Sequence, residues 1–287
     1  MKLKFKPTAI LFTILFSVLY TASYAGFPIG KGKWLLSPMY SYYGANSYWD
    51  KLKVLTPYEN GNGKFTSNYF GVYGGFGVDK NVDFIFNVPF VIQTYQNATT
   101  LVQNASMGDA SLGFSYFFNN DNPFKHTSLS GSLLIPLYQN SVINNLPANV
   151  TMPYVGFQTL GAEVKLGFSG TNIKTLKNTY YDVEGGIRQY FSASGPTQAF
   201  FNATFGVPLD NYWKLAATLS GVNSNGTANA ITNVYGLNRD FSYLRFTFAA
   251  GYKISKQTSL WANVFTDISG RNIGAGHGFS LFAVIKF

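Results

Sequence analysis

The chain contains no cysteine and little charge. Charged residues make up 11% of its 287 residues, whereas a typical soluble domain has about 25%. A chain without cysteine cannot be held together by disulfides, so its stability must come from its core or from closure of a sheet. A charge content this low does not suit a surface that faces water on every side.

Long hydrophobic runs are absent except near the N-terminus. Residues 10–20 are mainly apolar, three lysines precede them and Ser-Tyr-Ala follows at residues 23–25, which is typical of an export signal cleaved after Ala25. A retained membrane helix is the alternative, but it would need roughly 17 to 25 apolar residues, and this run is shorter. We therefore expect residues 1–25 to be removed as a signal peptide and residues 26–287 to form one domain.

Aromatic residues are abundant, with 27 Phe and 20 Tyr. This abundance suits strands whose outer face is apolar and is flanked by aromatic girdles. The formal net charge of +9 includes the three lysines of the export signal, and the remaining charges are scattered. Because no run of Lys or Arg is present, we expect no nucleic-acid partner.

The C-terminal residues 279–287 alternate between apolar and other side chains. A period of two places the apolar ones on one face of a strand. That face must lie against a second sheet in a soluble sandwich or against lipid in an outer membrane. We favour outer-membrane lipid as its partner, and we expect this strand to be the one through which the barrel-assembly machinery binds the chain. The apolar residues are Phe279, Leu281, Ala283, Ile285 and Phe287.

Alternation of this kind recurs along the whole domain and predicts about twelve strands. Most connections after odd-numbered strands are long and polar, and those after even-numbered strands are short. Outer-membrane barrels have this asymmetry, with short periplasmic turns, longer external loops and an even number of strands. The predicted strands lie near residues 34–43, 65–78, 82–95, 109–118, 126–138, 159–168, 179–191, 197–207, 213–221, 243–250, 259–268 and 279–287.

A closed barrel leaves no edge strand and satisfies every backbone group within lipid. We therefore predict an all-β fold, a transmembrane antiparallel up-and-down β-barrel of about twelve strands, with ten or fourteen as alternatives. It would lie in the bacterial outer membrane with both termini in the periplasm. The long predicted loops are residues 44–63, 96–107, 139–153, 222–240 and 269–277, and the loosest of the short ones is 170–178.

The same alternation places a set of charged side chains inside the barrel. One interpretation is a polar constriction that sorts solutes by charge and size. The other is a network that fills a narrow lumen without contacting any solute, because a barrel of this size lies between side-chain-filled and water-filled barrels. The inward charged residues are Glu163 and Lys165 on the sixth strand, Asp182, Glu184 and Arg188 on the seventh, Lys214 on the ninth and Arg245 on the tenth.

Several aromatic residues fall in the inward register as well. Such rings can stack against a flat, partly apolar solute. Alternatively, they fill volume or belong to the interfacial belts, since a slip of one residue would turn each of them toward lipid. These aromatic residues are Tyr180, Tyr190, Tyr243, Trp261 and Phe265.

An enzyme is a second hypothesis, because some outer-membrane barrels hydrolyse lipids. His126 and Ser128 have the spacing that puts a base and a nucleophile on one face of a strand. No acidic or amide residue beside His126 in the sequence would orient it, so we expect no catalytic residues. A third hypothesis is a barrel whose loops, especially residues 44–63 and 222–240, bind partners at the cell surface.

Four short motifs in the first half of the domain point to one family. They are the early strand that begins at Trp34, Val88-Pro89-Phe90, Met107-Gly108-Asp109 and Leu133-Leu134-Ile135-Pro136. In these motifs the chain resembles the transporter-like outer-membrane barrels named after a protein of the meta-pathway of phenol degradation. The resemblance implies a channel for small, often aromatic or hydrophobic molecules, and it supplies no catalytic residues.

This resemblance adds Asp109 to the candidate solute-binding residues, although a turn from loop to strand would explain it as well. Fatty-acid channels of the outer membrane carry a sizeable N-terminal plug. Here only Gly26–Lys33 precede the first predicted strand, so we expect any gate to come from loops or lumen side chains. The function we predict is passive passage or binding of small solutes in an outer-membrane channel, without a cofactor or metal ion.

Overall fold

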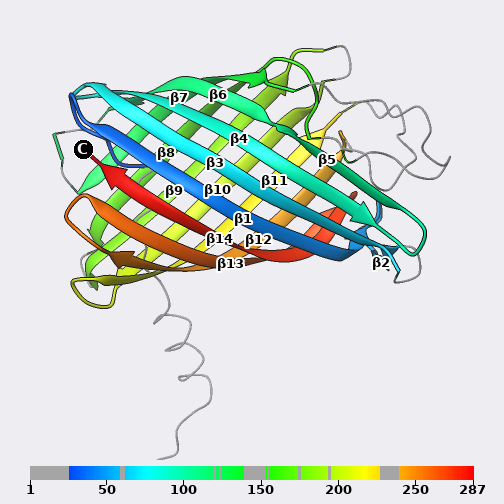
Figure 1. The fold of residues 1–287 in the computed structure, drawn as a ribbon. Helices are drawn as coiled ribbons and strands as arrows, with labels where there is room; N and C mark the ends of the chain where they lie inside the picture. Colours follow the sequence, from blue (N-terminus) through cyan, green and yellow to red (C-terminus); the bar gives the residue numbers. More distant parts are fainter. Residues whose placement is uncertain are drawn as a thin grey trace, which may run out of the picture.

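The molecule is a barrel of long, tilted strands (Figure 1). No helix in the described part of the chain is long and apolar enough to cross a membrane. The predicted signal peptide lies outside the described residues. The computed structural model describes residues 26–58, 62–118, 121–122, 124–138, 153, 155–173, 176–192, 195–226 and 239–287.

The strands of the described residues form a single sheet. In chain order they are β1 (Trp34–Trp49), β2 (Leu55–Pro57), β3 (Lys64–Asp79), β4 (Val82–Gln96), β5 (Leu101–Met107), β6 (Asp109–Phe117), β7 (Lys125–Pro136), β8 (Gly161–Ile173), β9 (Leu176–Tyr190), β10 (Thr197–Pro208), β11 (Trp213–Asn225), β12 (Phe241–Lys253), β13 (Thr258–Arg271) and β14 (Ile273–Lys286).

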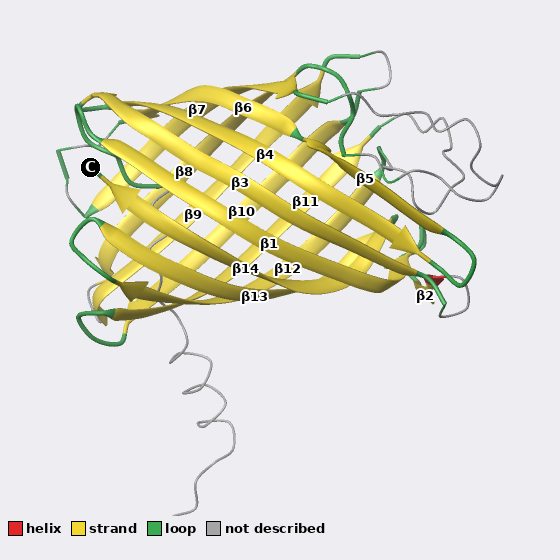
Figure 2. Ribbon diagram, in the orientation of Figure 1, coloured by secondary structure: helices red, strands yellow, loops and turns green. Residues whose placement is uncertain are grey.

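Twelve of these strands form a closed wall in which neighbours run antiparallel. β14 pairs with β1 from Lys286 opposite Leu35 to Ile273 opposite Trp49, and this pairing closes the sheet on itself. The two extra strands, β2 and β5, pair with the ends of β1 and β4. Figure 2 shows strands all the way round the wall. The predicted all-β, up-and-down barrel of about twelve strands is confirmed.

Apolar side chains cover the outside of the wall. On β8 the exposed residues are Val164, Leu166 and Phe168, which alternate with residues that point inward. β14 follows its predicted register, because Phe279 and Leu281 are exposed whereas Ser280 is buried. Burying this outer surface in lipid accounts for the low charge and high aromatic content of the chain.

Short turns join the strands at the end of the barrel where β1 begins and the C-terminus lies (Figure 1). Aromatic pairs lie at this end, with ring centroids 4.9 Å apart for Trp34 and Phe76 and also for Trp213 and Tyr252. Tyr and Trp are typical of the interface between lipid and water, since each has an apolar body and a polar tip. Because the short turns of outer-membrane barrels lie in the periplasm, this end is the periplasmic one.

Several predicted loops are strands in the structure. The predicted loop 269–277 is wrong, because β13 and β14 continue through it and meet at Asn272, which has a φ of 52°. Most of residues 170–178 also belongs to β8 and β9, and the predicted loop 96–107 contains β5. These segments extend the wall beyond the membrane. In these segments, alternation in the sequence was too weak to indicate strands.

The strand opposite β4 is interrupted at Gly108. β5 pairs with β4 up to Met107 opposite Phe90, and β6 resumes with Ser111 opposite Asn87, which leaves one extra residue between the two. The N–H of Gly108 donates a hydrogen bond to the carbonyl of Pro89 at 3.0 Å. This arrangement is a β-bulge, a device that redirects neighbouring side chains. It explains the Met-Gly-Asp motif structurally.

Candidate functional site: the barrel lumen

The structure places all eight predicted charged residues on the inner face of the wall. On β8 and β9 they occupy the positions between exposed Val164, Leu166, Val183 and Ile187. The five predicted inward aromatic residues also point into the lumen, and four of them are buried, namely Tyr180, Tyr190, Trp261 and Phe265. The register of these strands therefore follows the alternation in the sequence.

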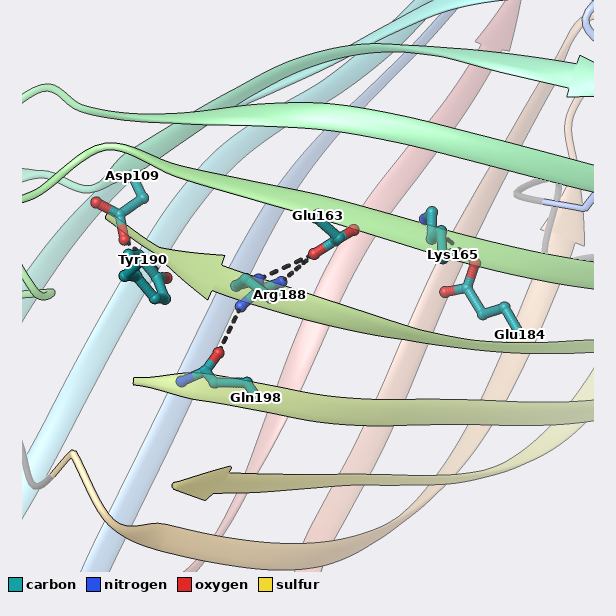
Figure 3. Close-up of polar contacts among 7 residues, drawn as sticks. All are labelled: Asp109, Glu163, Lys165, Glu184, Arg188, Tyr190 and Gln198. Carbon is teal, nitrogen blue, oxygen red and sulfur yellow. Dashed lines mark hydrogen bonds and ion pairs between the residues drawn. The ribbon is translucent and has the colours of Figure 1, made fainter. Parts of the chain in front are cut away.

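Two ion pairs cross from β8 to β9 (Figure 3). Arg188 lies directly opposite Glu163, and its Nη2 and Nε are 2.5 and 2.9 Å from Glu163 Oε2. Arg188 Nη1 also donates a hydrogen bond to Gln198 on β10 at 3.3 Å. Lys165 Nζ lies 3.2 Å from Glu184 Oε2. Because each cation has an anion beside it, this wall presents dipoles to the lumen more than net charge.

A third ion pair lies further round the wall, between β12 and β13. Arg245 on β12 binds Asp267 on β13, with 2.7 Å from Nε to Oδ1 and 3.2 Å from Nη2 to Oδ2. Its guanidinium also lies 4.4 Å from the ring centroid of Phe265 and 5.4 Å from those of Tyr43 and Tyr243. Aromatic faces attract a guanidinium, so these rings fix its position.

Asp267 is a lumen residue that the sequence interpretation missed. It has the same parity as Trp261 and Phe265 on its strand, and both of those residues were placed inward. The signal was therefore present in the alternation.

Asp109 lies near the extracellular end of the lumen, beside the bulge at Gly108. Tyr190 Oη donates a hydrogen bond to its Oδ2 at 3.2 Å (Figure 3). Tyr138, which follows β7, accepts a hydrogen bond from the N–H of Gln158 at 2.9 Å. Burial raises the pKa of Tyr138 above its ordinary value, so its hydroxyl stays protonated. Asp109 is thus part of a hydrogen-bonded group that packs the outer lumen.

Lys214 lies apart from the other predicted charges, at the periplasmic mouth of the lumen. It lines a cavity of about 170 Å³ together with Lys253, Lys256 and Lys286. The remaining lining includes polar residues of the turns that join β10 to β11 and β12 to β13. The mouth is therefore basic, in contrast to the paired charges higher in the barrel.

The segment before β1, Gly26–Lys33, crosses the inside of the barrel. At one end the carbonyl of Gly26 accepts a hydrogen bond from Ser169 on β8. Further along, the N–H of Ile29 donates to Asp83 Oδ2 on β4 at 2.8 Å, and Lys31 Nζ lies 3.0 Å from Asp79 on β3. In the order of the closed wall, β8 and β9 lie opposite β14 and β1, and β3 and β4 follow β1, so the segment crosses from one side of the barrel toward the other.

This segment is too short to form a sizeable plug, as expected from the sequence, but it still enters the lumen, where only loops and side chains were expected to form a gate. Ile29 packs in a buried cluster with Leu35, Trp261 and Val284, which belong to three different strands. An extended chain covers about 3.3 Å per residue, so a few residues suffice to cross a narrow barrel without forming a separate domain. The periplasmic half of the lumen is therefore narrowed by the chain's own N-terminal segment.

Two cavities adjoin in the lumen, and both are lined by residues of β1, β3 and β12–β14, the lower one also by residues of β4, β10 and β11. The lower one has a volume of about 300 Å³ and has no charged residue in its lining. The upper one, of about 430 Å³, contains Arg245. Such volumes fall within the range of small-molecule sites. Residues that line both cavities are Met39, Tyr69, Thr247 and Asn263.

His126 and Ser128 are both buried on the inner face of β7, in the periplasmic half. The ring of His126 packs against Phe27 and Phe117, with centroids 5.4 and 6.4 Å away. Both side chains thus point away from the lipid that a membrane hydrolase would attack. Among the described residues, no group of three or more acidic, His or Cys residues is arranged to hold a metal ion.

Comparison with known proteins agrees with this architecture. No protein-family model and no curated protein matches the chain. The crystal structure of an outer membrane channel from Pseudomonas putida F1 matches it with a TM-score of 0.70 at 12% identity, over 93% of this chain and 100% of that one. The translocator domain of the autotransporter NalP from Neisseria meningitidis matches with 0.51 at 13% identity, over 98% and 96%.

The fold is that of a bacterial outer-membrane β-barrel. Barrels of this kind form an outer membrane channel and an autotransporter translocator domain. The finer resemblance to the phenol meta-pathway family stays a prediction, because it rests on the four short motifs alone.

Proposed function

We propose that this outer-membrane barrel binds small solutes that carry no net charge, including aromatic ones, and lets them pass. The observation that carries the proposal is the lower cavity of about 300 Å³, which lies in the lumen and has no charged residue in its lining. The architecture shared with an outer membrane channel supports it. Ions pay a large desolvation cost in such a cavity, whereas neutral molecules do not.

The lining of the lower cavity suits a flat solute with a polar edge. Trp261 and Phe282 stack with centroids 6.0 Å apart and planes 10° from parallel. Tyr69 and Tyr73 also line the cavity, and Asn87 contributes a side-chain amide to the lining. Aromatic rings provide apolar contact area, and amides and hydroxyls provide hydrogen bonds that orient a ligand.

The ion pairs of the upper lumen suit the same kind of solute. The upper lumen contains two ion pairs, Glu163 with Arg188 and Arg245 with Asp267. In each pair the opposite charges lie less than 3 Å apart and largely cancel each other. A solute that enters from outside therefore meets side chains that can form hydrogen bonds, but it does not meet a strong net electrostatic field. This arrangement differs from the rings of like charge that make a pore selective for ions.

Uptake into proteoliposomes tests the proposal. We expect a neutral phenol to enter faster than benzoate or an aromatic ammonium of similar size. Asn87→Asp places a charge in the lower cavity and should slow entry of the phenol several-fold. As a control, Asn97→Asp alters an external turn, where the side chain accepts hydrogen bonds from the N–H groups of Thr99 and Thr100, and should leave uptake unchanged. Entry no faster than into protein-free vesicles would overturn the proposal.

A further inference from the structure

The four lysines at the periplasmic mouth come from three strands and one turn. Lys214 lies on β11, Lys253 ends β12 and Lys286 lies on β14, whereas Lys256 lies in the turn between β12 and β13. All four line the same cavity of about 170 Å³, and no acidic residue is among the described residues that line it. Different parts of the wall thus bring four lysine side chains to one small space.

Trp261 forms the inner limit of this cavity. Its ring lies over Gly251 on β12, where an added Cβ would collide with the indole. Gly251 pairs with Lys214 on β11 and with Trp261 on β13, so the ring lies next to the lysine. Trp261 and Val284 also line the lower cavity, and they therefore lie between the two spaces. The basic cavity is a compartment of its own at the mouth.

The turn between β12 and β13 holds polar groups at the edge of the cavity. Ser255 Oγ accepts hydrogen bonds from the N–H groups of Gln257 and Thr258, at 3.1 and 3.0 Å. The N–H of Lys286 donates a hydrogen bond to the carbonyl of Gln257 at 2.9 Å, which ties the end of β14 to this turn. Asn211 lines the cavity from the neighbouring turn. Hydroxyl and amide groups of this kind can donate hydrogen bonds to an oxyanion.

Repulsion among the lysines is only partly offset by acids. Lys286 is repelled by both Lys214 and Lys33. It is attracted by Asp83 on β4, and Asp210 adds one further negative charge in the turn that joins β10 to β11. These two carboxylates face the four lysines of the cavity and Lys33, so the mouth keeps a positive balance that a divalent anion would reduce.

We propose that this cavity is a binding site for free phosphate and phosphate monoesters of the periplasm. Lysine is a common phosphate ligand, because its ammonium is a compact charge with three hydrogen-bond donors. A phosphate dianion has the charge to offset the repulsion and enough oxygen atoms to contact lysines of several strands at once. Lys214 and Lys286 share the inward register of buried Ala216 and Val284, so the phosphate enters from the periplasmic opening of the lumen.

The phosphate groups of membrane lipids lie on the other side of the wall, which favours free phosphate over a lipid headgroup. The site is also separate from the lower cavity, so this inference goes beyond the proposed passage of neutral solutes. It holds or fails independently of which solute the barrel takes.

Calorimetric titration of the folded barrel with inorganic phosphate tests the proposal. The protein is refolded in dodecyl maltoside, which contains no phosphate, at a slightly alkaline pH where phosphate is mainly a dianion and at constant ionic strength. We expect saturable binding of one phosphate, at least about tenfold tighter than binding of acetate, because a monovalent anion makes fewer charge-assisted hydrogen bonds.

Three variants test the lysines one at a time. Lys214→Gln, Lys286→Gln and Lys256→Gln each remove one charge and keep a polar side chain, and each should weaken phosphate binding roughly tenfold. Lys256 lies in an exposed turn, so its replacement leaves the wall intact. Lys80→Gln is the matched control, because it removes a lysine from another turn at the same end, between β3 and β4, that does not line the cavity. It should bind phosphate as the wild type does.

A soluble phosphodiester lipid, dihexanoyl phosphatidylglycerol, distinguishes the two sources of phosphate and should not compete with inorganic phosphate. Three results would overturn the proposal: no saturable phosphate binding by the wild type, equal weakening in Lys80→Gln and Lys214→Gln, or displacement of phosphate by the lipid. Heat-dependent migration on gels confirms that each barrel is folded. Solute uptake plays no part in the measurement, so failure of this site and failure of the proposed function are distinct outcomes.

Discussion

At the scale of single residues, Asp267 controls how much charge Arg245 presents to the lumen. Its side chain is 1% exposed, whereas that of Arg245 is 28% exposed. The guanidinium thus contacts lumen water on one side and a buried carboxylate on the other. Arg245 cannot lose its proton, so its charge is cancelled only as long as Asp267 remains beside it.

Replacing this carboxylate should change ion selectivity. In Asp267→Asn the charge of Arg245 is no longer cancelled, so the reversal potential in planar bilayers should shift toward anion preference. The free energy of unfolding should fall by about 1–3 kcal/mol, because a charge-assisted pair is lost. Asp240→Asn is the matched control, since it breaks an Arg–Asp pair with Arg271 at the extracellular rim. An unchanged reversal potential in Asp267→Asn would show that Arg245 lies outside the ion path.

At the scale of elements, the bulge between β5 and β6 directs Asp109 toward Tyr190. The bulge leaves little room for a side chain at Gly108, because an added Cβ would lie 2.9 Å from Pro89 Cγ. Pro89 is held in β4 and its ring is rigid, so it cannot move far. The bulge therefore depends on glycine for packing reasons.

Substitution at the bulge should cost stability. We expect Gly108→Ala to lower the free energy of unfolding by about 1–3 kcal/mol, as overpacked sites do. Unfolding in urea, followed by gel migration, measures the change. Gly131→Ala on β7 is the control, because nothing lies within 4 Å of an added Cβ there. Equal effects of the two substitutions would contradict this account of the bulge.

The sequence predicts those elements that lie between lipid and lumen. All twelve wall strands were predicted, and the inward charges such as Glu163 and Arg188 followed from the same period of two. Elements outside the lipid were not predicted, namely β2, β5 and the hairpin around Asn272. The path of Gly26–Lys33 was missed as well, because a segment held by single hydrogen bonds to Asp83 and Ser169 carries no periodic pattern.

At the scale of the whole molecule, charge is distributed unevenly along the barrel axis. Paired charges line the middle and upper lumen, and four lysines line the cavity at the periplasmic mouth. Asp210 lies in the turn that joins β10 to β11, and the backbone N–H groups of Trp213 and Tyr212 lower its pKa, so it stays ionised and offsets part of this charge. The mouth remains basic on balance.

Reversing the charge at one lysine of the periplasmic mouth should therefore shift the ion selectivity of the barrel. In Lys214→Glu we expect the reversal potential to move toward cation preference, and we expect the shift to shrink at high salt because screening shortens the range of charge to roughly 3 Å at 1 M. Lys51→Glu on an external loop serves as the control. A shift of the same size in both variants would mean that surface charge in general, and not the mouth, sets the preference.

The seam between β1 and β14 has a consequence for assembly. Trp34 and Phe287 exchange backbone hydrogen bonds there, at 2.7 and 3.1 Å. Until β1 and β14 pair, the wall is an open sheet whose two edge strands have unpaired backbone N–H and C=O groups, and its interior can be reached from the side. Gly26–Lys33 are joined directly to β1, so they travel with one of those edge strands. The segment therefore takes its position across the lumen while the sheet closes, and it does not have to thread through a barrel that is already closed.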